Sequence, residues 1–165
     1  MKVPRPEKPI PLEVQREKLI SAYTGERINL HTDLIKLLGR EEGEKLYKQL
    51  YYETMKRVRQ NLPGGKLPIP ELMKRELISF PVLGFELEID EEEENGEQVF
   101  YEHLTKCPFL DKAREMGITD NVCDFICKYD VEFAAKDKRG RWEVISRMGD
   151  GDKECQFRIR EWAEE

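Results

Sequence analysis

The chain has 165 residues and a formal net charge of −6, with 38% charged and 39% hydrophobic residues. This length suffices for one domain whose apolar core needs neither disulfides nor a metal for stability. The acidic balance argues against nucleic acid as a partner, because nucleic-acid binders usually carry a basic face. No stretch approaches the ~20 apolar residues of a membrane span, so no membrane partner is expected either.

The first residues, Met-Lys-Val-Pro-Arg-Pro, lack the apolar stretch of a signal peptide, which predicts a cytoplasmic location. In that reducing compartment the four cysteines are expected to be free thiols, metal ligands or catalytic groups rather than disulfides. The high content of Glu, Lys and Arg is compatible with a thermophilic source, where surface ion-pair networks are favoured.

Four prolines near the start remove backbone donors and predict an extended arm over residues 1–11, which leaves residues 12–165 as a single domain. The apolar positions of residues 12–23 are compatible with a short helix. A stronger helical pattern, interrupted by two glycines, covers residues 34–58. A proline suited to a first turn opens another helix, predicted over residues 70–79.

Apolar and acidic residues alternate over residues 85–89, which is the period of a half-buried strand. The acidic run that follows and an Asn-Gly pair predict a hairpin loop over residues 90–96. A return strand over residues 99–105 carries His103 on one face and brings Cys107 to its end.

Two helices and two strands are predicted in the remainder of the chain. The helices cover residues 108–117 and 119–136, and the strands cover residues 142–145 and 155–159. The order of helices, a strand pair, helices and a second strand pair implies an α+β fold, with helices packed on an antiparallel sheet of about four strands.

The four cysteines are the strongest candidates for a functional site. Cys123 and Cys127 are four residues apart in a predicted helix, with Asp130 on the same stripe, and Cys107 and Cys155 lie where strands meet loops. Four thiolates can hold zinc or an iron–sulfur cluster, and three with an open position can activate water. The spacing matches no standard zinc-finger or ferredoxin signature. Buried cysteines of an ordinary core are the alternative.

A reactive thiol is the other chemical option for this region. Cys107 precedes a predicted helix, and the positive end of the helix dipole would lower its pKa. His103, four residues earlier, could act as a general base or ligand, or could simply form a hydrogen bond on the strand face.

Three motifs resemble the pattern of the 2-amino-thiazoline-4-carboxylate hydrolase family. They are Cys-Pro-Phe at residues 107–109, Cys127 with Asp130, and Gly-Asp-Lys-Glu-Cys-Gln-Phe at residues 151–157. The last motif also resembles the end of the four-vinyl reductase domain, a hydrocarbon-binding module related to TRAPP subunits of a Golgi-tethering complex. The resemblance implies helices on an antiparallel sheet around a small-molecule pocket, with Cys107, Cys127, Asp130 and Cys155 at family-type positions.

Three functions remain open at this point. The first is binding or sensing of a small, hydrocarbon-like molecule beside a cysteine site that holds zinc or, alternatively, an iron–sulfur cluster. The second is hydrolysis of a small ring containing sulfur and nitrogen, with Cys107 or Cys127 as nucleophile or metal ligand, Asp130 orienting a partner and His103 as base. The third is an interaction module that forms a homodimer through its helices.

Overall fold

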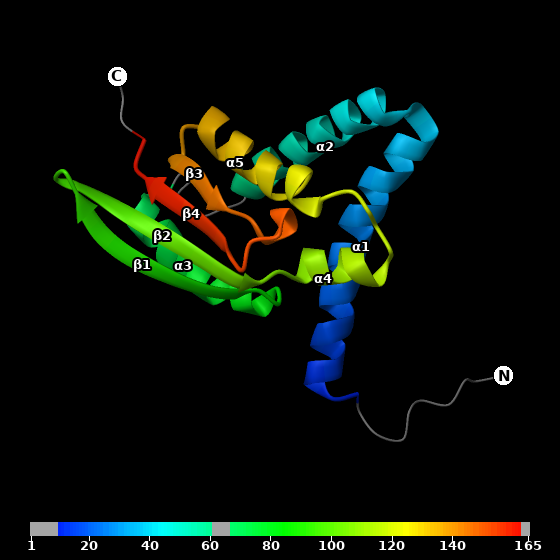
Figure 1. Cartoon of the computed structure of the whole chain (residues 1–165), viewed down its shortest axis with the longest axis horizontal. Coiled ribbons are helices and arrows are strands. Elements are labelled where there is room, and N and C mark those ends of the chain that lie inside the picture. The colour runs from blue at the N-terminus through cyan, green and yellow to red at the C-terminus, as the bar shows by residue number, and fades with distance from the viewer. Residues whose placement is uncertain (1–9, 61–66, 163–165) are drawn as a thin grey trace.

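The fold is that of a computed structural model, which describes residues 10–60 and 67–162. Most of the predicted extended arm, residues 1–9, lies outside the described residues. In chain order the elements are α1 (Leu12–Leu38), α2 (Arg40–Gln60), α3 (Ile69–Val82), β1 (Glu86–Glu94), β2 (Glu97–Lys106), α4 (Pro108–Glu115), α5 (Cys127–Lys136), β3 (Arg141–Ser146) and β4 (Cys155–Arg160), with short 3-10 turns at Val122–Asp124 and Met148–Asp150 (Figure 1).

The four strands of the described chain form one antiparallel sheet in the order β1-β2-β4-β3. Helix α3 contacts β1 and helix α5 contacts β3, while α1 packs on α2 and α4. Alternate residues of β4, from Cys155 through Phe157 to Ile159, are buried, as expected for a strand with one face on the core. The predicted α+β fold is confirmed.

The acidic run before the hairpin belongs to strand β1, and the prediction that it forms a loop is wrong. Residues 90–94 pair with residues 97–101 of β2, so the turn contains only Asn95 and Gly96. Both turn residues have positive φ, 53° and 83°, which Asn and Gly adopt most readily. The strand therefore continues as far as the first residues that can reverse the chain.

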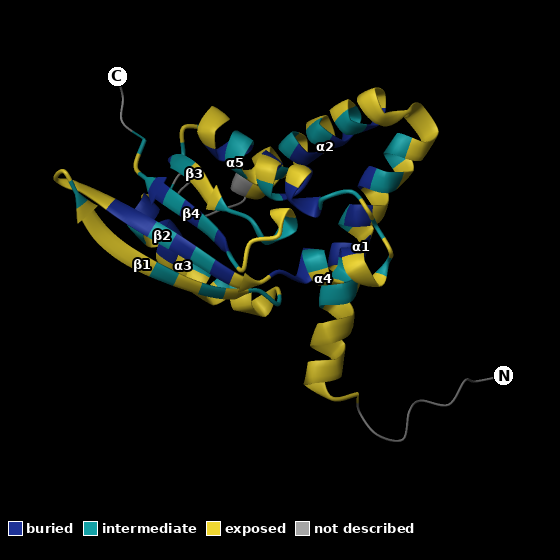
Figure 2. Cartoon of the chain, viewed as in Figure 1, coloured by how far each residue is buried: buried dark blue, intermediate teal, exposed yellow. Residues whose placement is uncertain are grey.

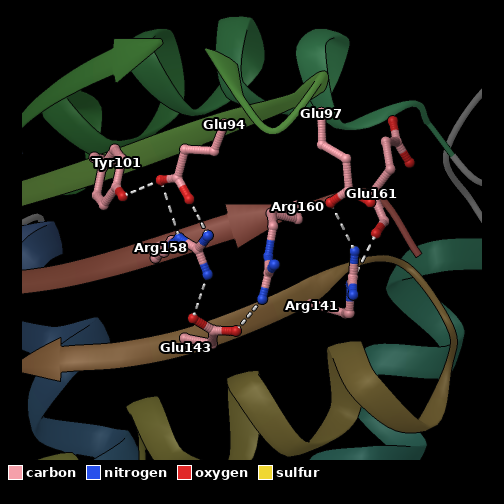
Figure 3. A network of polar contacts seen from close by, with 8 residues as sticks. All are labelled: Glu94, Glu97, Tyr101, Arg141, Glu143, Arg158, Arg160 and Glu161. Atoms are coloured by element: carbon pink, nitrogen blue, oxygen red, sulfur yellow. Dashed lines mark hydrogen bonds and ion pairs between the residues drawn. The ribbon is translucent and has the colours of Figure 1, made fainter. Parts of the chain in front are cut away.

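Arginines on β4 pair with acidic residues of β1 and β3, among them Glu94, the last residue of the acidic run (Figure 3). Arg158 pairs with Glu94 from β1 and, at 2.8 Å, with Glu143 from β3. Glu143 also pairs with Arg160, and Tyr101 donates a hydrogen bond to Glu94. Isolated surface pairs stabilise little, but this linked network spans the four strands on the outer face of the sheet.

Helix α1 replaces the short helix predicted over residues 12–23 and the start of the next one. The helix continues past its two threonines, because the hydroxyls of Thr24 and Thr32 donate back to the carbonyls of Ile20 and Ile28 one turn earlier. The chain instead breaks at Gly39, whose φ of 81° ends α1 before α2 begins.

The N-terminal part of α1 extends away from the body of the molecule, and its residues 12–19 are exposed (Figure 2). Leu12 and Leu19 retain 80% and 71% of their accessible surface, so this part of the helix is held by few apolar contacts. In the described ranges, no helix combines the length and the apolar character that crossing a membrane requires.

The segment predicted as one helix over residues 119–136 is a 3-10 turn followed by α5. The side chain of Asn121 accepts a hydrogen bond from the backbone N–H of Cys123, which begins the separate turn. Cys123 therefore lies in the turn and Cys127 is the first residue of α5. Their predicted placement on one face of a single helix is wrong.

Candidate functional site

A cavity of about 270 Å³ lies between the inner face of the sheet and the helices α3 and α5. Most of its wall is apolar, with aromatic rings contributed by Phe80, Phe133 and Trp142. This volume is close to the lower end of the range for ligand sites, ~300–1,000 Å³. The cavity offers the space that a small organic molecule needs.

Asp130 is, besides Cys127, the predicted site residue that lines this cavity. It lies in the first turn of α5, inside the domain, and its side chain keeps accessible surface toward the cavity. Burial raises the pKa of its carboxyl to about 6, although Arg27 and Arg139 act in the opposite direction. A carboxyl with this pKa can both take up and release a proton near neutral pH, as a general acid or base must.

Two guanidinium groups line the same cavity. Arg27 of α1 donates a hydrogen bond to the Tyr23 hydroxyl at 3.1 Å and lies 5.1 Å from the ring centroid of Tyr51 and 5.3 Å from that of Phe109. These rings hold the cation against the wall through cation–π contacts. Arg139, three residues after α5, acts electrostatically on Asp130. Paired guanidiniums suit the binding of a carboxylate.

Two further carboxyls lie in the cavity wall, Glu76 from α3 and Glu102 from β2. Glu102 keeps only 4% of its accessible surface, and burial together with the hydrogen bond that its protonated carboxyl donates to Glu76 raises its pKa well above the ordinary value. Burial also raises the pKa of Glu76. Two carboxyls with raised pKa values thus line the same cavity as the arginines.

Sequence reasoning missed both glutamates, although each interrupts an apolar pattern. Glu102 lies between Phe100 and Leu104 on the buried face of β2. Glu76 is four residues from Leu72, a buried residue of α3 that lines the same cavity. An acidic residue in the middle of a buried stripe is the signal that could have identified them.

Three of the four cysteines form a buried group that we call the thiol cluster, Cys107, Cys123 and Cys155. Cys123 is in hydrogen-bonding contact with both Cys155 and Cys127. The backbone N–H of Met148 donates to the sulfur of Cys155 at 3.2 Å. Cys127 is only half-buried and lines the cavity, so it links the two regions.

The thiol cluster is held in the protonated form. The contact with Cys127 and burial raise the pKa of Cys123 to about 11, and the contact with Cys123 and burial raise that of Cys155 further. For Cys107, burial raises the pKa to about 11, although the backbone N–H groups of Leu110 and Phe109 favour the thiolate. The expected activation of Cys107 at a helix start is therefore outweighed by its loss of contact with water.

His103 lies away from the cavity. It alternates with Glu102 and Leu104 along β2, so it faces the outer side of the sheet. There its ring nitrogens lie 3.5 Å from Asp90 and 3.3 Å from Glu154. This arrangement fits the alternative in which His103 forms a hydrogen bond on the strand face.

Metal binding gains no support from this geometry. In the parts of the chain that the structure describes, which include all four cysteines, no three His, Cys, Asp or Glu side chains converge as metal ligands do. Zinc and an iron–sulfur cluster at Cys107, Cys123, Cys127 and Cys155 stay predictions from the sequence, and we derive no chemical step through them.

Comparison with known families gives one match. A family model described as L-2-amino-thiazoline-4-carboxylic acid hydrolase matches residues 16–159, which is most of the chain. The matched region contains every charged residue of the cavity named above and extends far beyond the C-terminal motifs. No curated protein matches the chain.

Proposed function

The chain belongs to the L-2-amino-thiazoline-4-carboxylic acid hydrolase family, and from this premise we propose that it opens a small sulfur- and nitrogen-containing ring by hydrolysis. One observation carries the proposal. Asp130, a carboxyl with a pKa of about 6, faces an apolar cavity together with Arg27 and Arg139. This is a general base beside an anion-binding pair, in a site of suitable size.

The compound in the family name has charges that match this cavity. It is a five-membered ring in which one carbon is bonded to sulfur, to a ring nitrogen and to an amino group, and the ring carries a carboxylate. Arg27 and Arg139 supply two cations for the carboxylate. The aromatic wall covers the ring and limits the access of bulk water.

The chemistry assigned to Asp130 is proton transfer with water. Asp130 takes a proton from water as the oxygen adds to the carbon between nitrogen and sulfur. The carbon–sulfur bond then breaks, the carbon becomes the carbonyl of a urea, and the sulfur leaves as a thiol. The two hydrogens of the water end on the ring nitrogen and on the sulfur, so Asp130 is ready for another turnover.

Cys127 is placed where a covalent route could use it, because it lines the same cavity. The general-base route needs no thiol, since water attacks the ring directly. Cys127→Ser is therefore expected to keep most of the ring-opening rate. A complete loss in this variant would assign the covalent route instead.

The test is to incubate the protein with 2-amino-Δ2-thiazoline-4-carboxylate and follow the ring-opened product by mass spectrometry. Asp130→Asn is expected to lower kcat by about 10²–10⁴-fold, the usual contribution of a positioned general base. Asp33→Asn, an exposed aspartate of α1 remote from the cavity, is the matched control and should leave kcat unchanged. Equal kcat in Asp130→Asn and the unmodified chain would contradict the proposal.

Binding without turnover is the second candidate, and the largely apolar wall of the cavity favours it. This candidate retains the small-molecule part of the binding or sensing prediction. The two candidates separate in the same experiment. Saturable binding of the ring compound with no product from the unmodified chain would favour a binding protein.

A further inference from the structure

Two carboxyls from distant parts of the sequence meet at one wall of the cavity. Glu102 comes from the inner face of β2 and Glu76 from helix α3, which contacts the adjacent strand β1. Glu102 keeps only 4% of its accessible surface, and the two side chains are hydrogen bonded to each other. Because a carboxylate only accepts hydrogen bonds, this contact requires that the pair hold a proton.

The pair also has unused acceptors. Glu76 Oε2 and Glu102 Oε1 are buried and, apart from the contact between the two carboxyls, have no hydrogen-bond partner among the described residues. Unpartnered buried carboxyl oxygens are costly in a folded protein and are commonly found where a ligand supplies the missing donors. The pair is therefore incomplete without a donor from outside the chain.

The charged groups around the pair do not supply this donor. Arg139, which follows α5, attracts Glu76 electrostatically, whereas Asp130 of α5 and Arg27 of α1 line other parts of the cavity wall. Burial and Glu76 raise the pKa of Glu102, and no cation acts to lower it. The other side chains of β2 and β4 that line the cavity, Leu104 and Phe157, are apolar.

The chemistry of these oxygens selects the ligand. Two acceptors from two carboxyls match a planar cation that carries N–H donors on one carbon, such as an amidinium or an isothiouronium group. A hydrocarbon would leave both oxygens unpaired. A metal ion would need more ligands, and no such group exists among the described side chains.

We propose that Glu76 and Glu102 form a binding site for the planar cationic head of an amidine-type ligand, and that binding of this cation releases the proton that the two carboxyls share. The inference deepens the proposed function and rests on it for the identity of the ligand, since an amino-thiazoline ring carries such a head. The cation is then held on the β2–α3 side of the cavity, and a carboxylate on the same ligand lies toward Arg27 and Arg139.

Proton release is the signature that a merely structural pair would not give. A cation at the pair stabilises its deprotonated form, so protons leave the protein as the ligand binds. A neutral ligand of the same shape has no such effect. The pair also determines specificity, because the neutral ligand leaves its oxygens unpaired.

The experiment uses 2-amino-Δ2-thiazoline, a cation without a carboxylate, in isothermal titration calorimetry at pH 7. Repeating the titration in two buffers of different ionisation enthalpy counts the protons released. The expected result for the unmodified chain is release of up to about one proton per ligand bound. 2-Methyl-Δ2-thiazoline, largely neutral at this pH, is expected to bind at least about 10-fold more weakly and to release none.

Variants test the two glutamates separately. Glu102→Gln and Glu76→Gln are each expected to weaken binding of the cation at least about 10-fold and to abolish proton release. Glu88→Gln, on the exposed side of β1, is the matched control and should change neither quantity. Binding of the cation without proton release by the unmodified chain, or unchanged affinity in both cavity variants, would overturn the proposal.

The two proposals fail in different ways. Loss of ring opening in every assay, with cation binding and proton release intact, would remove the hydrolase function but leave the cation site. Ring opening that does not depend on Glu76 or Glu102 would remove the cation site but leave the hydrolase function. The measurement on the unmodified chain requires no substitution, so a variant that fails to fold does not prevent the decision.

Discussion

The thiol cluster and the cavity are two buried regions of one core, and both contain groups that can ionise. In the thiol cluster, sulfur contacts and burial keep Cys107, Cys123 and Cys155 protonated. In the cavity, Asp130 remains accessible and has a pKa near neutrality. Burial raises the pKa in both regions, from 9.0 to about 11 for Cys107 and from 3.8 to about 6 for Asp130, so the kind of residue decides which group ionises near neutral pH and access to water decides which one can meet a ligand.

This difference assigns separate roles to the two regions. A thiol that is protonated and packed in the core is a poor nucleophile and acts mainly as an apolar group of moderate size. A carboxyl that faces a water-accessible cavity can exchange protons with a ligand. Under the proposed function, Cys107, Cys123 and Cys155 act as core residues and the carboxyls of the cavity carry the chemistry.

The largest expected effect is on thiol reactivity. With iodoacetamide and the folded protein at pH 8, Cys127 should be alkylated at least about 100-fold faster than the thiol cluster, because alkylation of buried thiols requires local opening that costs a few kcal/mol. Peptide mass spectrometry gives the rate at each cysteine. In denaturant the four rates should become similar, which is the control for intrinsic reactivity.

Two further outcomes of this experiment test the difference between the cavity and the thiol cluster. Slower alkylation of Cys127 in the presence of the thiazoline cation would place the ligand in the cavity. Rapid alkylation of Cys107 in the folded protein would show that the thiol cluster is open to solvent, and its assignment to the core would be wrong.

The next effect tests how tightly the thiol cluster is packed. A Cβ atom added at Gly149 would lie 2.6 Å from the sulfur of Cys123 and 2.2 Å from Oδ1 of Asn121. Asn121 cannot easily move, because it accepts from the N–H of Cys123 and donates to Asp150. Gly149→Ala is therefore expected to lower the free energy of unfolding by about 2–3 kcal/mol in urea denaturation.

A double-mutant cycle provides the control. Asn121→Ala removes the nearest clashing atoms, so the double variant with Gly149→Ala should be less destabilised than the sum of the two single variants. Additive effects, or a Gly149→Ala variant as stable as the unmodified chain, would mean that the region around Cys123 is loosely packed.

The sequence predicts the layers of the fold better than the details of the site. Alternation in β1 and β2, and the motifs around Cys107 and Cys155, lead to the correct α+β class because period and turn residues are local properties. The family resemblance also singles out Asp130, which lines the cavity, and its role as a site residue stays a prediction. These predictions need no knowledge of which side chains meet across the core.

The missed features depend on tertiary contacts. Glu102 is an ordinary charged residue until β2 turns it toward Glu76, and only then do the two carboxyls share a proton. The pKa of Cys107 is raised, whereas the helix-dipole argument predicts that it is lowered. The reason is that burial outweighs the effect of two backbone N–H groups. The separate turn at Cys123 follows from one side-chain hydrogen bond of Asn121.

The smallest effect is on the free energy of unfolding, which the buried carboxyl of Asp130 lowers. Its pKa rises from 3.8 to about 6 on folding, so between these values the folded chain holds a proton that the unfolded chain has lost. Stability therefore falls as pH rises through this interval and is constant, for this group, outside it. The full shift corresponds to about 3 kcal/mol, and contact with water in the cavity reduces the expected cost to about 1–2 kcal/mol.

Asp130→Asn removes this cost, because the amide never ionises. The variant should be more stable than the unmodified chain by about 1–2 kcal/mol at pH 8, and the difference should vanish by about pH 2.5, where Asp130 is protonated in both states. Urea denaturation at the two pH values measures it, with Asp33→Asn as the exposed control. A variant that gains stability while it loses ring opening would show that Asp130 is kept for chemistry, because a residue kept for the fold would have the opposite effect.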